Sequence, residues 1–251
     1  MTEILIIMFF ALLGVITQRI VGFGIAAFLA PVALIFFAPP VAIVTTILVG
    51  TLSCALILFQ TRKNSLVNIK VVTRILLGAI PGLLIGAYIV TRIDKAPLQI
   101  IVGALVIIGA LIQEFLLPKP RRAFGETRGI TVSGFFSGLL NATAANGAPP
   151  MAMWLRTHKI TPEQLIQNIA AMFLCVNLCS LTAIHFQKPE TYSSDVFINI
   201  IFLIPVVFLG NSIGNRLRKR VKVKLYEALV VSVIILTGLI SITIGTINLT
   251  S

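Results

Sequence analysis

Two interruptions in otherwise apolar sequence contain the residues best suited to bind a ligand, at 17–24 and 141–150. The residues of interest are Gln18, Arg19, Gly22, Phe23 and Gly24 in the first, and Asn141, Thr143, Asn146, Gly147 and Pro149 in the second. Glycine lets a ligand approach the backbone closely because it has no Cβ atom. A helix that begins at such a break presents unpaired N–H groups and a partial positive charge. The two interruptions therefore predict a binding site for a small anion.

The second interruption has the residue types of a helix start. Asn146 is expected to cap the helix, Gly147 to bend the chain and Pro149 to occupy the first turn. Two such helix N-termini brought together would form a positively polarised pocket at the midplane of a membrane. The side chains of Asn141, Thr143 and Asn146 would add hydrogen-bond donors to it, and Gln18 could do so from the first break. The alternative is that these residues only permit kinks and close helix packing.

The sequence around the breaks indicates a membrane protein. The chain has 251 residues, of which 57% are hydrophobic and 11% charged, whereas about 25% are charged in a soluble domain. Uncharged runs of about 20 residues, the length that crosses a hydrocarbon core, recur from end to end. This composition excludes a soluble globular enzyme, a disordered chain and a disulfide scaffold.

Eight apolar stretches are predicted, at about 4–37, 41–59, 71–90, 97–117, 129–155, 164–186, 196–215 and 225–247. The first and the fifth contain the polar breaks. Polar clusters survive at membrane depth only when they are buried in protein or line a cavity. We therefore expect both stretches to be broken helices or re-entrant hairpins.

The two halves of the chain resemble each other. An offset of 128 residues aligns the Gly-x-x-x-Gly motif at 82–86 with that at 210–214, and a gapped match links Pro40 to Pro162. The predicted fold is an all-α polytopic membrane protein with two inverted repeats and about eight full transmembrane helices, with a broken or re-entrant helix at the start of each repeat. A single integral-membrane transporter domain would then span 1–251, with repeat one at 1–117, a basic linker at 118–124 and repeat two at 125–251.

The basic residues predict the topology. The net charge of +12 would suggest nucleic acid in a soluble protein, but these residues occupy short loops, as the positive-inside rule requires, so no nucleic-acid partner is expected. If each broken stretch enters and leaves on one side, all basic residues except Arg92, Lys95 and Lys188 become cytoplasmic. Both termini then lie on the non-cytoplasmic side. Oppositely oriented repeats with broken helices are typical of secondary transporters.

Several polar residues near the breaks allow two interpretations. A charged residue at the bilayer centre costs about 2.5–3.5 kcal/mol, so Arg19 is either an anion gate or a topology residue that reaches the interface. A further set occupies the helices after the breaks: Thr45, Thr46, Gln167, Asn168 and Asn177. These residues could line a cavity wall or form hydrogen bonds between helices.

The sequence does not support an enzyme. It contains no His-x-x-x-His, no Gly-x-Ser-x-Gly and no plausible nucleophile–base couple. Cys54, Cys175 and Cys179 lie in apolar runs, where packing explains them better than metal or redox chemistry, and no cofactor is expected. Residues 1–3 lack a basic n-region, so the first apolar stretch is expected to be retained as a membrane segment. The alternative function is a membrane anchor or assembly protein without transport.

These features resemble the sulfite exporter TauE/SafE family, also called the toluene-sulfonate uptake permease family. The resemblance rests on Gly22, Gly24 and Pro31, on their partner segment at 146–150, and on the paired Gly-x-x-x-Gly helices. It implies export or uptake of small sulfur-containing anions across the cytoplasmic membrane. A sulfite or sulfonate group has three oxygens that could accept N–H bonds. Transport direction, coupling to protons or cations, and assembly into a homo-oligomer stay open.

Overall fold

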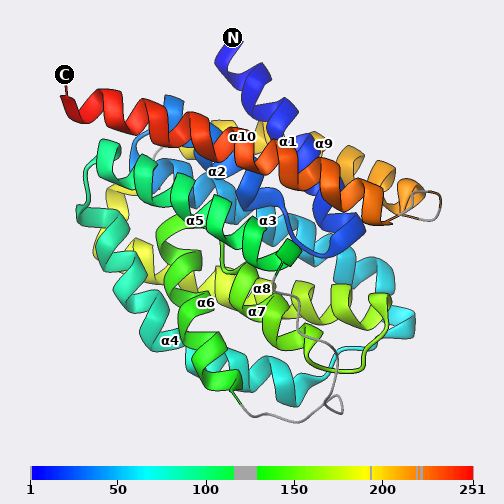
Figure 1. Ribbon diagram of the computed structural model, residues 1–251. Coiled ribbons are helices and arrows are strands. Elements are labelled where there is room, and N and C mark those ends of the chain that lie inside the picture. Colours follow the sequence, from blue (N-terminus) through cyan, green and yellow to red (C-terminus); the bar gives the residue numbers. More distant parts are fainter. Residues whose placement is uncertain (1, 116–128, 193, 219, 221–222, 251) are drawn as a thin grey trace.

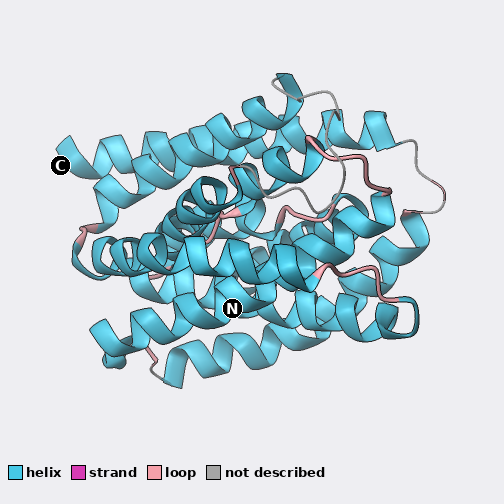
Figure 2. Cartoon of the chain, turned by 90° about the horizontal axis from the view of Figure 1, so that it is seen from below, coloured by secondary structure: helices cyan, strands magenta, loops and turns pink. Residues whose placement is uncertain are grey.

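The chain folds into a bundle of helices with short connections (Figures 1 and 2). The computed structural model describes residues 2–115, 129–192, 194–218, 220 and 223–250. Within these ranges it contains helices and loops but no strand. The helices are α1 (Thr2–Val21), α2 (Ile25–Phe36), α3 (Pro39–Thr61), α4 (Ile69–Arg92), α5 (Lys95–Phe115), α6 (Ile130–Ala144), α7 (Ala148–Arg156), α8 (Pro162–Gln187), α9 (Ser194–Leu217) and α10 (Val223–Thr250). Short 3-10 turns at Arg62–Asn64 and Pro189–Thr191 complete the secondary structure.

The predicted apolar stretches correspond to these helices, and both predicted breaks are confirmed. The first stretch is divided into α1 and α2 at residues 22–24, and the fifth into α6 and α7 at residues 145–147. Five of the described helical segments are long and apolar enough to cross a membrane: Thr2–Val21, Pro39–Asn64, Ile69–Arg92, Pro162–Gln187 and Val196–Leu217. The chain is therefore a multi-pass α-helical membrane protein, and the count of about eight crossings stays a prediction.

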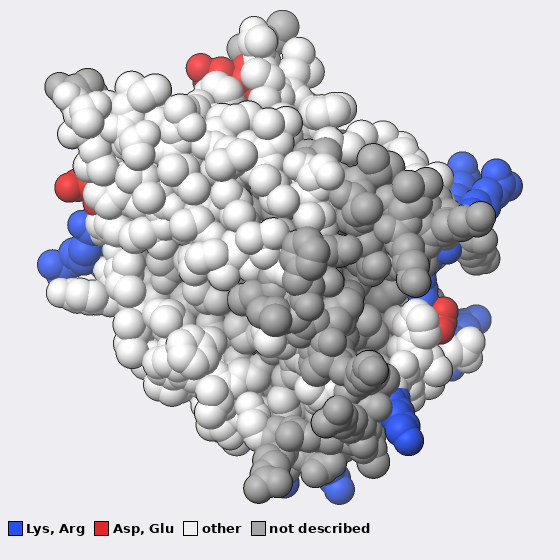
Figure 3. All heavy atoms as spheres, in the orientation of Figure 1, with Lys and Arg blue, Asp and Glu red and all other residues white. Residues whose placement is uncertain are grey.

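The outer surface suits a lipid environment. Large apolar side chains on α4 and α9 point outward, among them Leu77, Ile201 and Phe208. In the face shown in Figure 3, Lys and Arg lie along the margins, and the described surface between them is almost free of charge. A broad apolar belt of this kind would be an aggregation hazard in water but matches a bilayer.

Glycines bring the helices into close pairs. α4 packs along α6, α9 along α1, and α5 along α10, as Figure 1 shows for α5 and α10. A Cβ atom on Gly82 would overlap the Phe135 carbonyl of α6, and one on Gly214 would lie 3.0 Å from the Ile16 carbonyl of α1. The two Gly-x-x-x-Gly motifs thus permit equivalent close contacts in the two halves, as small residues commonly do between membrane helices.

One end of the bundle collects the end of α2, the start of α5 and the end of α10. Lys95 Nζ donates a hydrogen bond of 2.9 Å to the Ile35 carbonyl. Asn248 Nδ2 donates one of 3.2 Å to Gln99 Oε1. We call this region the Lys95 end. The helix α1 runs parallel to α9, with Leu12 and Val15 near Gly210 and Ile16 near Gly214. Since α9 ends at the opposite end of the bundle, where Arg218 pairs with Glu163, both helices start at the Lys95 end. The α1–α2 hairpin therefore opens toward the Lys95 end.

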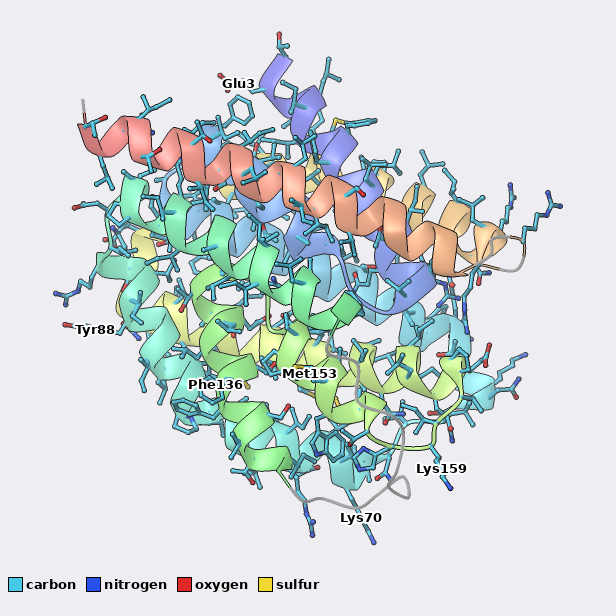
Figure 4. All side chains as sticks on the ribbon, in the orientation of Figure 1. Glu3, Lys70, Tyr88, Phe136, Met153 and Lys159 are labelled. Carbon is cyan, nitrogen blue, oxygen red and sulfur yellow. The ribbon has the colours of Figure 1, made fainter. Side chains whose placement is uncertain are left out.

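The opposite end, which we call the Glu163 end, collects the start of α8, the end of α9 and the start of α4. Arg218 and Glu163 form an ion pair of 2.6 Å there. Lys70 and Lys159 extend from the same edge of the molecule, far from Glu3 (Figure 4). α6 begins beside the first half of α4, and α7 leads within a few residues to the start of α8. The α6–α7 hairpin therefore opens toward the Glu163 end.

Candidate functional site

The first break reverses the chain through two glycines. Gly22 has φ +97° and Gly24 has φ +137°, values that other residues rarely adopt. A Cβ atom on Gly24 would lie 2.6 Å from Thr17 Cγ2, and one on Gly14 would lie 2.8 Å from Ile25 Cα. The start of α2 is thus folded back against the last turns of α1.

The second break also reverses the chain, but it is held by serine hydrogen bonds instead of by two glycines. Ala145 turns the chain with φ +55°. Ser137 Oγ then donates a 2.7 Å hydrogen bond to the Gly147 carbonyl, and Ser133 Oγ donates a 2.6 Å bond to the Pro150 carbonyl. Since the earlier residue of α6 binds the later residue of α7, the two helices run antiparallel.

The sequence prediction for the start of α7 is partly wrong. A proline does lie in the first turn, but the N-cap is Gly147, with no side-chain cap, rather than Asn146. The left-handed conformation of Ala145 completes the turn one residue early. Asn146 is consequently left beside the helix start, where its side chain lines a cavity instead of closing the helix.

The two breaks face a common cavity with a volume of about 30 Å³. Its lining consists of Gln18, Phe23, Gly24, Ile25, Ala26, Thr46, Ile47, Gly50, Asn141, Ala145, Asn146, Ala148, Phe173 and Asn177. This lining includes no charged side chain, and it contains the first residues of both α2 and α7. A volume of this size holds about two water molecules, so the cavity is narrow and would have to widen to admit an anion.

Two buried amides in the cavity wall leave one polar atom each without a partner among the described residues. Gln18 Nε2 donates to Cys54 Sγ at 3.1 Å, whereas Gln18 Oε1 has no partner. Asn141 Nδ2 donates to Asn177 Oδ1 at 3.0 Å and to Ser180 Oγ at 3.1 Å, whereas Asn141 Oδ1 has none. Gln18 is 4% exposed and Asn141 is 1% exposed. Such atoms are uncommon in folded proteins and call for an explanation.

The two amides occupy corresponding positions in the two halves. Both hydrogen bonds, Gln18–Cys54 and Asn141–Asn177, join residues 36 positions apart, and the second pair follows the first by 123 positions (141 minus 18). The same separation links the N-caps of α2 and α7 and the first residues of α3 and α8. α3 starts at Pro39, so the correspondence lies one residue away from the Pro40–Pro162 match expected from sequence.

The predicted site residues divide into two groups. Six line the cavity: Gln18, Phe23, Gly24, Thr46, Asn141 and Asn146. The others lie outside its lining: Arg19, Gly22, Thr45, Thr143, Gly147, Pro149, Gln167 and Asn168. Asn177, which was a candidate for the wall, also lines it. Gly50 and Phe173 were missed, although each lies one helical turn from a polar lining residue and so on the same helix face.

Gln167 and Asn168 have a different role, because they hold the loop between α3 and α4. Gln167 Oε1 accepts a 2.7 Å hydrogen bond from the Leu66 amide. Asn168 Oδ1 accepts a 2.9 Å bond from the Asn68 amide. The sequence left open a cavity wall or hydrogen bonds between helices for this pair; the structure instead shows hydrogen bonds from α8 to a loop. Thr46 and Asn168, which the sequence match paired, thus lie in different surroundings.

Arg19 points away from the cavity, toward α9. Its Nη2 donates a 2.8 Å hydrogen bond to Asn215 Oδ1, and the side chain is 4% exposed. Thr143 Oγ1 satisfies itself on the Leu139 carbonyl at 2.8 Å. Thr45 Oγ1 is buried without a partner among the described residues. Arg19 and Thr143 thus form hydrogen bonds within and between the helices around the cavity, and none of the three residues belongs to its lining.

A bundle of apolar helices with two broken hairpins around a buried polar cavity defines a class of multi-pass membrane protein to which many secondary transporters belong. The family model of the sulfite exporter TauE/SafE matches residues 6–240. The chain therefore belongs to the sulfite exporter TauE/SafE family of membrane transporters, as its resemblance predicted. No curated protein and no solved structure matches it.

Proposed function

We propose that the protein carries a small sulfur-containing oxyanion, sulfite or a sulfonate, across the cytoplasmic membrane and binds it between the N-termini of α2 and α7. The observation that carries the proposal is the shared cavity, which contains both helix starts and no acidic side chain. Membership of the family supports the class of substrate.

The helix starts supply the positive potential. The N-cap residues are Gly24 for α2 and Gly147 for α7, and neither provides a side-chain hydrogen bond to the N–H groups of the first helical turn. Unsatisfied N–H groups and the helix dipole favour an anion at such positions. The two starts are unequal, because Pro149 and Pro150 have no N–H to offer. α2 would therefore supply most of the backbone donors, and Asn146 would supplement α7.

The buried amides would complete the ligand shell. An unsatisfied buried polar group costs about 1–3 kcal/mol, and Gln18 and Asn141, which both line the cavity, each have one among the described residues. Rotation of the Gln18 amide by 180° would turn its NH2 group toward a bound oxyanion and let Oε1 accept from the Cys54 thiol. Asn141 could donate to the anion in the same way only if Asn177 also rotated, because two amide oxygens would otherwise face each other.

The arrangement of the halves supports alternating access between inverted repeats. The hairpin α1–α2 opens toward the Lys95 end and α6–α7 toward the Glu163 end, and corresponding cavity residues are 123 positions apart. In this proposal each repeat makes three complete crossings after its hairpin, so six complete crossings and two hairpins replace the eight full crossings expected from the sequence. The Glu163 end is cytoplasmic and both termini are not. Rocking of one repeat against the other would open the cavity to each side in turn.

The test is counterflow of labelled sulfite and of sulfonates in proteoliposomes, with imposed proton or Na⁺ gradients to measure coupling. Asn141→Asp places a negative charge against the anion. At about 4 Å and an effective dielectric of about 20 the repulsion is about 4 kcal/mol, so we expect the affinity to fall by about a thousandfold. Asn248→Asp, the same change at an exposed helix end, should have no effect. Unchanged affinity in Asn141→Asp would contradict the site. A folded protein without flux of any anion would favour the anchor or assembly alternative.

A further inference from the structure

Arg19 is a buried cation whose hydrogen-bonding capacity is mostly unused. Only Nη2 has a partner, the Asn215 side chain. Nε and Nη1 are both buried and have none among the described residues. A guanidinium usually uses its planar fork of donors on a carboxylate or a similar oxyanion. Two free N–H edges on an arginine that is 4% exposed therefore indicate a missing acceptor.

The neighbouring helix adds a second unsatisfied group. Asn211 is 1% exposed, and both its side-chain polar atoms lack a partner within the described part of the chain. It lies one helical turn before Asn215 and so on the same face of α9. Gly214 lies between them, and the absence of a side chain there leaves room for Arg19. A Cβ atom added to Gly214 would lie 2.7 Å from the Cβ atom of Arg19. The α1–α9 contact thus places Arg19 against Asn215, and the buried Asn211 lies one turn away along the same face of α9.

Nothing in the described part of the chain neutralises this cation. The ion pair found there joins Arg218 to Glu163, and Arg218 brings a second positive charge whose field reaches Arg19. Removing a charge from water costs several kcal/mol unless a counter-charge compensates it. A small anion held by the free edge of the guanidinium would supply that compensation.

The feature is present in only one half of the molecule. The residue 123 positions after Arg19 is Ala142, which is fully buried against the corresponding helix α4. Successive residues of a helix project about 100° apart, so Gln18 faces the cavity while Arg19 faces α9. Arg19 therefore lies beside the central cavity, next to the part of α9 that ends at the Glu163 end.

We propose that Arg19, with Asn211 and Asn215, forms a second binding station for the transported oxyanion, between the central cavity and the Glu163 end. The proposal rests on the proposed function, since the ligand is the same anion. Because the station exists on one side only, it raises the affinity for anion that enters from the Glu163 end and leaves the opposite entrance unaffected.

The test is sulfite transport in proteoliposomes of uniform orientation, with the KM measured separately from each side. Arg19→Gln should raise the KM at least about tenfold from the Glu163 end and leave the other KM within about twofold, while Arg19→Lys should retain part of the affinity. Lys63→Gln, which removes an exposed charge near the same end, is the matched control and should change neither value. An equal change on both sides, or none, would overturn the station.

A second variant protects the test against misfolding. Asn211→Leu removes an unsatisfied buried group and should be at least as stable as the unmodified protein, yet it should also raise the KM from the Glu163 end. Unchanged KM values in a folded Asn211→Leu protein would overturn the role of Asn211 and Arg19 together. The central site is tested separately, because Asn141→Asp should raise the KM from both sides.

Discussion

Gly24 combines two constraints that substitution can separate. Its φ of +137° is strained for any residue with a side chain, at a cost of about 1–3 kcal/mol. A Cβ atom would also lie 2.6 Å from Thr17 Cγ2, and such overpacking costs about 1–3 kcal/mol. We therefore expect Gly24→Ala to lower the free energy of unfolding by about 2–6 kcal/mol, and to reduce transport because Gly24 is the N-cap of α2 and lines the cavity.

Two further variants separate the backbone contribution to this loss of stability from the steric contribution. Gly129→Ala changes a glycine with φ +76° that has open space around it, so it should lose only the backbone contribution, about 1–2 kcal/mol. Thr17→Ser in the Gly24→Ala background removes the obstructing methyl group but keeps the hydroxyl that donates to the Leu13 carbonyl. It should recover about 1–3 kcal/mol and part of the transport.

The assay is unfolding by SDS titration in bicelles, with anion counterflow measured on the same preparations. Gly24→Ala and Gly129→Ala with equal losses would refute the steric part of the reasoning. No recovery on adding Thr17→Ser would refute the assignment of the clash to the Thr17 methyl group. Full transport in a destabilised Gly24→Ala protein would refute the link between this turn and the anion site.

Two other predictions concern packing around the site. Gln167→Ala with Asn168→Ala removes the hydrogen bonds to the 64–68 loop and should cost about 1 kcal/mol for each bond lost, with the KM unchanged; a raised KM would return both residues to the anion site. Gly82→Ala overlaps the Phe135 carbonyl of α6, a backbone atom, whereas Gly210→Ala meets Val15 of α1 less closely, at 2.9 Å from its Cγ1. Unfolding should therefore begin at a lower SDS fraction in Gly82→Ala, and the reverse order would refute this view of the interfaces.

The apolar runs, and the glycine, proline and polar residues that interrupt them, were enough to predict the helices and both breaks. The apolar runs, the Gly22–Gly24 turn and the 145–150 segment act locally, through transfer of side chains into lipid and through backbone geometry. The prediction of an N-cap at Asn146 was wrong because Ala145 adopts a left-handed backbone conformation. Alanine has no local preference for that conformation, so the sequence gives no sign of it.

The composition of the cavity depended on tertiary structure. Gln167 and Thr46 are both polar residues early in the helices after the breaks, yet one holds a loop and the other lines the cavity. Which of them faces the centre is decided by the rotation of α3 and α8 against their neighbours, and a single-residue shift in register turns a helix by about 100°.

The sequence by itself therefore determined that this chain is a multi-pass helical membrane protein with two polar breaks, because those properties depend on residues close together in the chain. Only the tertiary structure decided that Gln18 and Asn141 meet across one cavity and that Arg19 turns away toward Asn215. These contacts join residues far apart in sequence, and they depend on how closely glycine-lined helices approach one another.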